Sequence, residues 1–112
     1  MVMVLNLELG MPTVEMAKRR LNSGLSNARS QRVRAVKLIH GYGSSGKGGR
    51  IKREVHRQLE SMKLEGRIRE YVKGEEFSPF EASARHAIDL CPELAKDRDY
   101  SYCNHGITVV VL

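Results

Sequence analysis

A glycine-rich segment is the part of the sequence best suited to bind an anion, because residues 41–49 read GYGSSGKGG and five of them are glycine. The segment follows a β-type run that ends at His40 and precedes an amphipathic run, so backbone amides and a helix N-terminus would meet there. The cationic residues Lys47, Arg50 and Arg53 follow within a few positions. A phosphate of a polynucleotide fits such a site, although glycines also serve where a loop only needs positive φ angles.

Part of this segment matches the P-loop of nucleoside triphosphatases, in which a glycine, four residues, a second glycine and a lysine precede a Ser or Thr. Gly41, Gly46 and Lys47 agree with the pattern, but Gly48 stands where the hydroxyl should bind magnesium. No later predicted strand ends in an Asp that would complete the metal site. ATP hydrolysis is therefore not expected, and a phosphate or nucleotide binder of P-loop type stays open as an alternative function.

Three further side chains near the predicted site could take part in chemistry or binding. His40 could bind a phosphate or act as an acid or base, or it could be a structural ring that hydrogen-bonds the loop backbone. Glu8 ends the first predicted strand and is the other candidate catalytic group. Tyr42, between two glycines, could stack on a base or pack on the loop. By contrast, His56 and His86 lie in predicted helices and are expected at the surface.

The two cysteines give no sign of a metal centre or of a disulfide framework. Cys91, Cys103 and His105 lack the paired short spacing of zinc ligands, and no fourth ligand is in register. A nucleophilic Cys103 with His105 as its base is also disfavoured, because near neighbours along a chain seldom face each other. We expect reduced thiols and no cofactor, with a divalent metal only in the case of nuclease activity.

Charge is distributed unevenly along the 112 residues, which carry a formal net charge of +6. Residues 1–73 hold 16 basic and 6 acidic side chains, whereas residues 74–112 hold 3 and 7. The basic part fits a DNA or RNA partner, and an acidic helix predicted over residues 78–91 leaves a protein-interaction module as an alternative function. No run approaches the length of a membrane helix and no leader is recognised, so we expect a cytoplasmic protein without membrane contact.

Apolar periodicity predicts two long helices and four strands. The helices span residues 13–29 and 50–63, and the strands span residues 2–8, 33–40, 67–73 and 107–112. Ser78 and Glu81 have the spacing of a capping box, which predicts a shorter helix over residues 78–91. The order βαβαβ, an inserted helix and a final strand favours a two-layer α/β sandwich with one four-stranded mixed sheet. The last strand is apolar on both faces and should be central.

Alternation along the third predicted strand places Ile68 and Val72 on one side. The opposite side would carry Arg67, Arg69, Tyr71 and Lys73. A basic face with one aromatic ring is typical of either a solvated sheet face or a nucleic-acid platform. In the second case, the face would extend the positive surface of the glycine segment and of the helix after it.

The strand that ends in His40 and Gly41, followed by Gly43 and a helix, resembles the Smr (small MutS-related) domain. The signature of that family runs His, Gly, any residue, Gly, any residue, Gly. Similar residues begin the first predicted helix and form the terminal strand, namely Gly10, Met11, Thr13, Val14, Glu15 and Ala17, and His105, Gly106, Ile107, Thr108, Val109 and Val110. The resemblance covers nearly the whole chain and implies a single domain over residues 1–112, with an insertion at about 77–104.

The resemblance also implies a fold and a function. The fold would be a compact α/β structure similar to the C-terminal domain of translation initiation factor three. The chain would bind DNA or RNA and could cleave one strand, because several family members are nicking or single-strand endonucleases. The residues that would contact nucleic acid are His40, Gly41, Tyr42, Gly43, Ser45, Gly46, Lys47, Arg50 and Arg53.

Two departures from the family pattern concern the cleavage chemistry and the loop. The family's Leu, Asp, any residue, His corresponds to residues 5–8 here, which read LNLE, so the usual acid and imidazole are absent. The third glycine of the signature falls on Ser45, and Gly46 follows one place later. We therefore expect binding with weak or no cleavage, for which His40 and Glu8 would be the remaining catalytic groups.

Overall fold

The computed structural model of the chain describes residues 2–42 and 47–112, with only the backbone of Lys47 and Gly48. In this part, the strands are β1 (Val2–Asn6), β2 (Ala35–Ile39), β3 (Glu70–Lys73) and β4 (Ile107–Val111). The helices are α1 (Val14–Ser30), α2 (Lys47–Leu64) and α3 (Ala82–Leu90), and α3 is flanked by the short 3-10 helices η1 (Gly74–Glu76) and η2 (Pro92–Lys96). No helix among these residues is long and apolar enough to cross a membrane.

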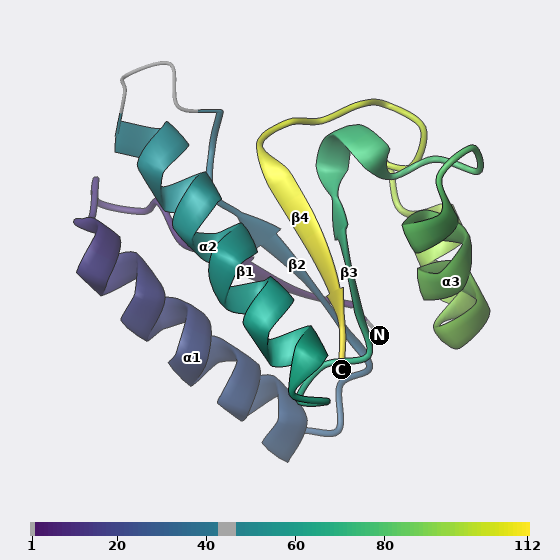
Figure 1. Cartoon of the computed structure of the whole chain (residues 1–112), viewed down its shortest axis with the longest axis horizontal. Coiled ribbons are helices and arrows are strands. Elements are labelled where there is room, and N and C mark those ends of the chain that lie inside the picture. Colours follow the sequence, from purple (N-terminus) through teal and green to yellow (C-terminus); the bar gives the residue numbers. More distant parts are fainter. Residues whose placement is uncertain (1, 43–46) are drawn as a thin grey trace.

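The sheet has the strand order β1-β2-β4-β3 (Figure 1). β1 pairs with β2 in parallel, and β4 runs antiparallel to both β2 and β3. β4 is therefore central, as its apolar sequence predicts, and each of its residues is buried. The predicted α/β class and four-stranded mixed sheet are confirmed, whereas the likeness to the C-terminal domain of translation initiation factor three stays a prediction.

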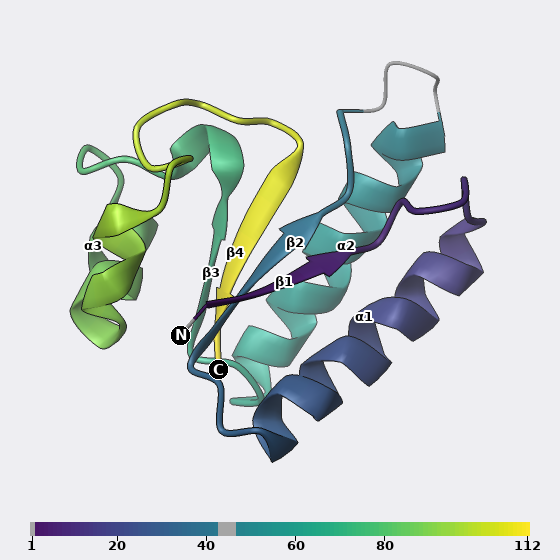
Figure 2. The same cartoon turned by 180° about the vertical axis from the view of Figure 1, so that it is seen from behind.

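Figures 1 and 2 show α1 and α2 side by side on one face of the sheet. Their apolar side chains meet alternate strand residues in a first core that includes Leu21, Leu25, Leu38, Val55, Leu59 and Val110. The inserted segment packs on the other face in a second core that includes Val72, Phe77, Ala84, Ala87, Leu94 and Val109. Full burial of a large side chain such as Phe77 contributes roughly 1.5–3 kcal/mol, so the insertion is part of the folded core.

The start of α3 differs from the prediction. Phe80 N donates a hydrogen bond to Ser78 Oγ (3.4 Å) within a turn, and the helix begins only at Ala82. Glu81, the residue before the helix, makes no side-chain cap hydrogen bond. The capping-box prediction is wrong because the serine hydroxyl is used in the turn that precedes the helix.

The predicted basic face of the third strand does not form either. The ladder of β3 begins at Glu70, and Ile68 packs in the core beneath α2 while Val72 packs on the opposite face. Tyr71 packs on the α2 side, where its hydroxyl donates a hydrogen bond to a carboxylate of that helix. The alternation fails because residues 67–69 lie in a loop before the strand, and a loop does not keep the two-residue period.

Candidate functional site

The carboxyl ends of β1 and β2 lie side by side because the two strands run parallel. Just beyond them, Leu7 N donates a hydrogen bond to Ile39 O (2.8 Å), and Glu8 N donates one to Asn6 Oδ1 (2.9 Å). Gly41 has a φ of +79°, and a Cβ at this position would collide with the Glu8 carboxylate. The structure thus brings two residues of the predicted site together, and Glu8 is exposed.

A shallow pocket of about 220 Å³ opens at the same end of the sheet. Its lining includes Glu8, Gly41, Tyr42, Asn104 and Gly106. The Tyr42 ring lies against Gly106, yet the residue stays 67% exposed, so much of the ring is available to a ligand. Gly106 O accepts hydrogen bonds from His40 N (3.0 Å) and Gly41 N (3.1 Å), which ties the start of the glycine segment to the beginning of β4.

His40 is completely buried at the end of β2. Its Nδ1 lies 3.0 Å from Gly41 O, and its Nε2 lies 2.8 Å from Thr108 Oγ1 of β4. Burial lowers the pKa of the ring below its usual 6.5, so the imidazole is neutral at pH 7. This geometry fits the structural role considered for His40, because both ring nitrogens already have partners.

His56 of α2 belongs to the same network, whereas the sequence predicted a surface position for it. Its Nε2 lies 2.8 Å from Thr108 Oγ1, and its ring meets the His40 ring edge-on with centroids 5.6 Å apart. Burial is the main reason that the pKa of His56 falls to about 4, followed by the coupling to His40, since two neighbouring rings resist being protonated together; the positive charges of Lys73 and Lys52 act in the same direction. His56 and Thr108 are 52 positions apart, so no local spacing in the sequence could have revealed this pair.

These three side chains form one hydrogen-bonded chain whose direction follows from the donors and acceptors. A carbonyl only accepts, so the proton of neutral His40 is on Nδ1, facing Gly41 O. Nε2 of His40 then accepts from the Thr108 hydroxyl, and Thr108 Oγ1 accepts from the Nε2–H of His56. The chain connects the backbone of Gly41 to β4 and to α2, and so it fixes the first residue of the glycine segment.

The cations near the glycine segment divide into free and paired groups. Arg50 and Arg53 are exposed in the first turns of α2, and neither forms an ion pair within the described residues. Lys52 Nζ lies 3.1 Å from Glu75 Oε2, and Arg57 pairs with a carboxylate one turn earlier on the same helix. The remaining predicted contacts lie outside the described part of the chain, namely Gly43, Ser45, Gly46 and the side chain of Lys47.

Cys103 and His105 do face each other, which corrects the expectation drawn from their closeness in the sequence. Cys103 Sγ lies 3.6 Å from His105 Nε2, in a loop where Cys103 itself has a φ of +52°. This left-handed residue bends the backbone sharply and allows the two side chains to meet. The other cysteine, Cys91, is buried, and burial raises the pKa of its thiol. Within the residues that the structure describes, no three His, Cys, Asp or Glu side chains gather as a metal site.

Comparison with protein-family models adds the observation that decides the family, because the Smr domain model matches residues 7–77, more than half of the chain. The chain belongs to the Smr domain family. In this Smr domain, the matched segment runs from the turn after β1 through α1, β2, the glycine segment, α2 and β3. The family is associated with nucleic-acid binding and nicking. Comparisons with curated proteins and with solved structures gave no significant match.

Proposed function

We propose that this Smr domain binds DNA or RNA through its glycine-loop pole, by which we mean the carboxyl ends of β1 and β2 together with the first turns of α2. The observation that carries the proposal is that Gly41, the exposed Tyr42 and the cations Arg50 and Arg53 belong to this one end, and that neither arginine forms an ion pair with any described residue. The N-terminus of α2 adds backbone N–H groups and the positive end of the helix dipole. These groups would bind phosphates while the Tyr42 ring stacks on a base.

Binding at this pole is expected to occur with little or no cleavage. General acid-base catalysis contributes typically about 10² to 10⁴-fold in rate, and it needs groups that can reach the substrate. Asn6 stands in the family's acidic position and accepts a hydrogen bond from Glu8 N, and His40 is buried with both ring nitrogens bonded. Glu8 is the exposed group that remains, and the family's imidazole is replaced in the sequence by this same residue.

The protein-interaction alternative depends on the acidic helix of the inserted segment, where Glu81 and Asp89 are exposed. Other acidic side chains of the C-terminal segment already have cationic partners. Asp97 and Asp99 both pair with Lys37, and Glu75 pairs with Lys52. The nucleotide-binding alternative still lacks the hydroxyl that a P-loop offers to magnesium. A polyanion at the glycine-loop pole therefore has the stronger support.

The binding proposal is tested by fluorescence anisotropy of labelled single-stranded RNA and duplex DNA over a series of salt concentrations. Arg50→Gln combined with Arg53→Gln should weaken binding about tenfold and reduce the slope of log affinity against log salt by about 2, because two phosphate contacts are lost. Arg57→Gln is the matched control, since that guanidinium on the same helix is already paired. Unchanged binding in the double variant would show that this pole is not the site.

The cleavage expectation is tested by prolonged incubation of the protein with labelled single-stranded RNA and supercoiled DNA, with and without a divalent metal. We expect both substrates to remain uncut. Strand breaks that appear with the wild type and disappear with Glu8→Gln would instead show that the site uses a different catalytic group from the rest of the family.

A further inference from the structure

A second cationic surface lies at the opposite end of the sheet, and the proposed function does not use it. We call it the arginine pole and define it by Arg29, Arg32, Arg34, Arg67 and Arg69. The first of these is in the last turn of α1, and the others lie in the loops that lead into β2 and β3. Because β2 and β3 both run antiparallel to β4, the two loops meet at one end of the sheet, the lower end in Figure 1.

The arginines of this pole are not neutralised by ion pairs with side chains in the described part of the structure. All five arginines are exposed, and within residues 2–42 and 47–112 none of them forms an ion pair with a carboxylate. The nearby Lys63 differs, because its ammonium lies 2.8 Å from Glu70 Oε1. Arg34 acts electrostatically on Glu93 of η2, at the margin of the surface. Several like charges on one exposed surface create a positive potential that attracts polyanions.

Backbone hydrogen bonds hold the arginines of this pole in place. The Arg29 side chain donates through Nη2 to Arg67 O (2.8 Å) and so joins the last turn of α1 to the loop before β3. Leu112 N donates to Arg34 O (2.8 Å), and Arg69 N donates to the last carbonyl of β4 (2.9 Å). Arg34 and Arg69 are therefore anchored on opposite sides of β4, which limits the conformational entropy that their backbones lose when a ligand binds.

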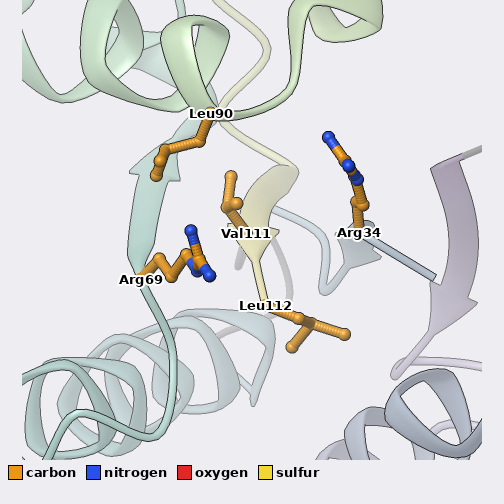
Figure 3. A pocket seen from close by; sticks show the side chains of 5 residues that line it. All are labelled: Arg34, Arg69, Leu90, Val111 and Leu112. Atoms are coloured by element: carbon orange, nitrogen blue, oxygen red, sulfur yellow. The ribbon is translucent and has the colours of Figure 1, made fainter. Parts of the chain in front are cut away.

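Figure 3 shows Arg34 and Arg69 on the two sides of the end of β4, around a pocket of about 200 Å³. Its other lining residues are Leu90, Val111 and Leu112, whose side chains are apolar. A guanidinium presents its N–H donors as a planar fork that matches phosphate oxygens. Two such forks flanking an apolar patch suit a phosphodiester, whose phosphate takes the donors while its sugar contacts the patch.

We propose that the arginine pole is a second nucleic-acid contact surface, which binds phosphates separately from the glycine-loop pole. This inference rests on the proposed function, because the same polyanion occupies both surfaces. A strand of five residues such as β2 is about 17 Å long, so one phosphate cannot reach both poles. The domain would therefore contact two separate stretches of nucleic acid at once.

The test uses a double variant that carries both Arg34→Gln and Arg69→Gln. Its RNA affinity is compared with that of the wild type by the same anisotropy measurements over a series of salt concentrations. The probe is a single-stranded RNA long enough to reach both poles. We expect about tenfold weaker binding and a salt slope reduced by about 2, as for the other pole. Arg57→Gln with Arg85→Gln is the matched control, because it removes the same charge at exposed positions outside both poles.

The possible outcomes separate the two proposals. If the Arg34 and Arg69 double variant and the control bind alike while the Arg50 and Arg53 variant binds weakly, the second surface is refuted and the proposed function stands. If the Arg34 and Arg69 double variant is the one that loses RNA binding, while the Arg50 and Arg53 variant binds like the wild type, the arginine pole is a binding site and the glycine-loop pole is not. If a polyglutamate of the same charge displaces the RNA as effectively as unlabelled RNA does, the pole selects acidic chains in general and the nucleic-acid assignment is wrong.

Discussion

The two ends of the sheet carry their polar groups in different ways. At the glycine-loop pole, polarity continues into the interior, where His40, Thr108 and His56 are joined by hydrogen bonds and Lys37 is buried in the lining of the pocket. At the arginine pole, Arg34 and Arg69 are exposed and flank a pocket whose other lining side chains, Leu90, Val111 and Leu112, are apolar. The difference teaches that residues of the first pole serve folding and binding together, whereas residues of the second can change binding alone.

The largest expected effect on stability comes from Lys37, which is only 8% exposed and forms ion pairs with Asp97 (3.1 Å) and Asp99. Lys37→Ala leaves two carboxylates without their cation, and breaking a buried pair in this way costs about 3 to 5 kcal/mol of unfolding free energy. Urea unfolding measures the loss. Adding Asp97→Asn and Asp99→Asn to Lys37→Ala should recover part of the lost unfolding free energy. If Lys37→Ala alone is as stable as the wild type, the contrast between the two poles is wrong.

The next effect comes from the hydroxyl that both imidazoles share. Thr108→Val keeps the shape of the side chain but removes the partner of His40 Nε2 and of His56 Nε2. Leaving buried polar atoms unpaired costs about 1 to 3 kcal/mol each, so the loss of both partners should lower the unfolding free energy by roughly 2 to 6 kcal/mol in the same experiment. Thr108→Ser is the control, because it keeps the hydroxyl. A serine variant as unstable as the valine variant would show that methyl packing, and not the network, matters there.

Acidification should weaken the same network while the arginine pole stays charged. The folded-state pKa values of His40 and His56 lie below 6.5, at about 4 for His56, so between pH 6.5 and pH 4 the unfolded chain binds protons that the folded chain excludes. The stability contributed by the neutral rings is complete above pH 6.5 and declines as the pH falls through this range. When the unfolding free energy is measured at a series of pH values, it should fall less steeply with decreasing pH for His56→Gln than for the wild type. If the curves of unfolding free energy against pH are parallel for the two proteins, His56 is not the buried neutral ring that we describe.

The smallest effect on stability is expected at the arginine pole. Arg34→Gln with Arg69→Gln should change the unfolding free energy by no more than about 0.5 kcal/mol, because both side chains are exposed and neither forms an ion pair within the described residues. The measurement is urea unfolding of the same protein samples that are used for RNA binding. A loss of several kcal/mol would mean that these arginines support the fold, and the contrast between the poles would fail.

The sequence predicts the elements of this fold well, because apolar periodicity and glycine punctuation are local signals. The four strands, the two long helices and the central place of the last strand all follow from it. The side to which Tyr71 points and the late start of α3 do not follow, since each depends on a few residues of loop or turn before the element. A shift of one residue in a strand reverses its faces, so boundary errors become errors of orientation.

The candidate site is predictable only in its local part. The glycines, His40 and Gly41 carry a recognisable pattern, and Glu8 is found through its place before the first loop. The burial of His40 and the participation of His56 depend on Thr108, which approaches from a strand near the other end of the chain. Likewise, Lys37 and Asp97 are 60 positions apart, and no periodicity relates them.

The central position of β4 also governs how the chain can acquire its structure during synthesis. β2 and β3 do not pair with each other; each is hydrogen-bonded to β4. Before Ile107–Val111 has left the ribosome, the nascent chain can form only β1, α1, β2 and α2 as a partial unit, while β3 and the inserted segment have no strand to join. Completion of the sheet must therefore wait for this strand, and with it arrives Thr108, the hydroxyl that both imidazoles require. A premature stop codon between β3 and residue 107 would yield a product in which β2 and β3 both lack their common partner, and such unpaired strand edges favour aggregation and degradation.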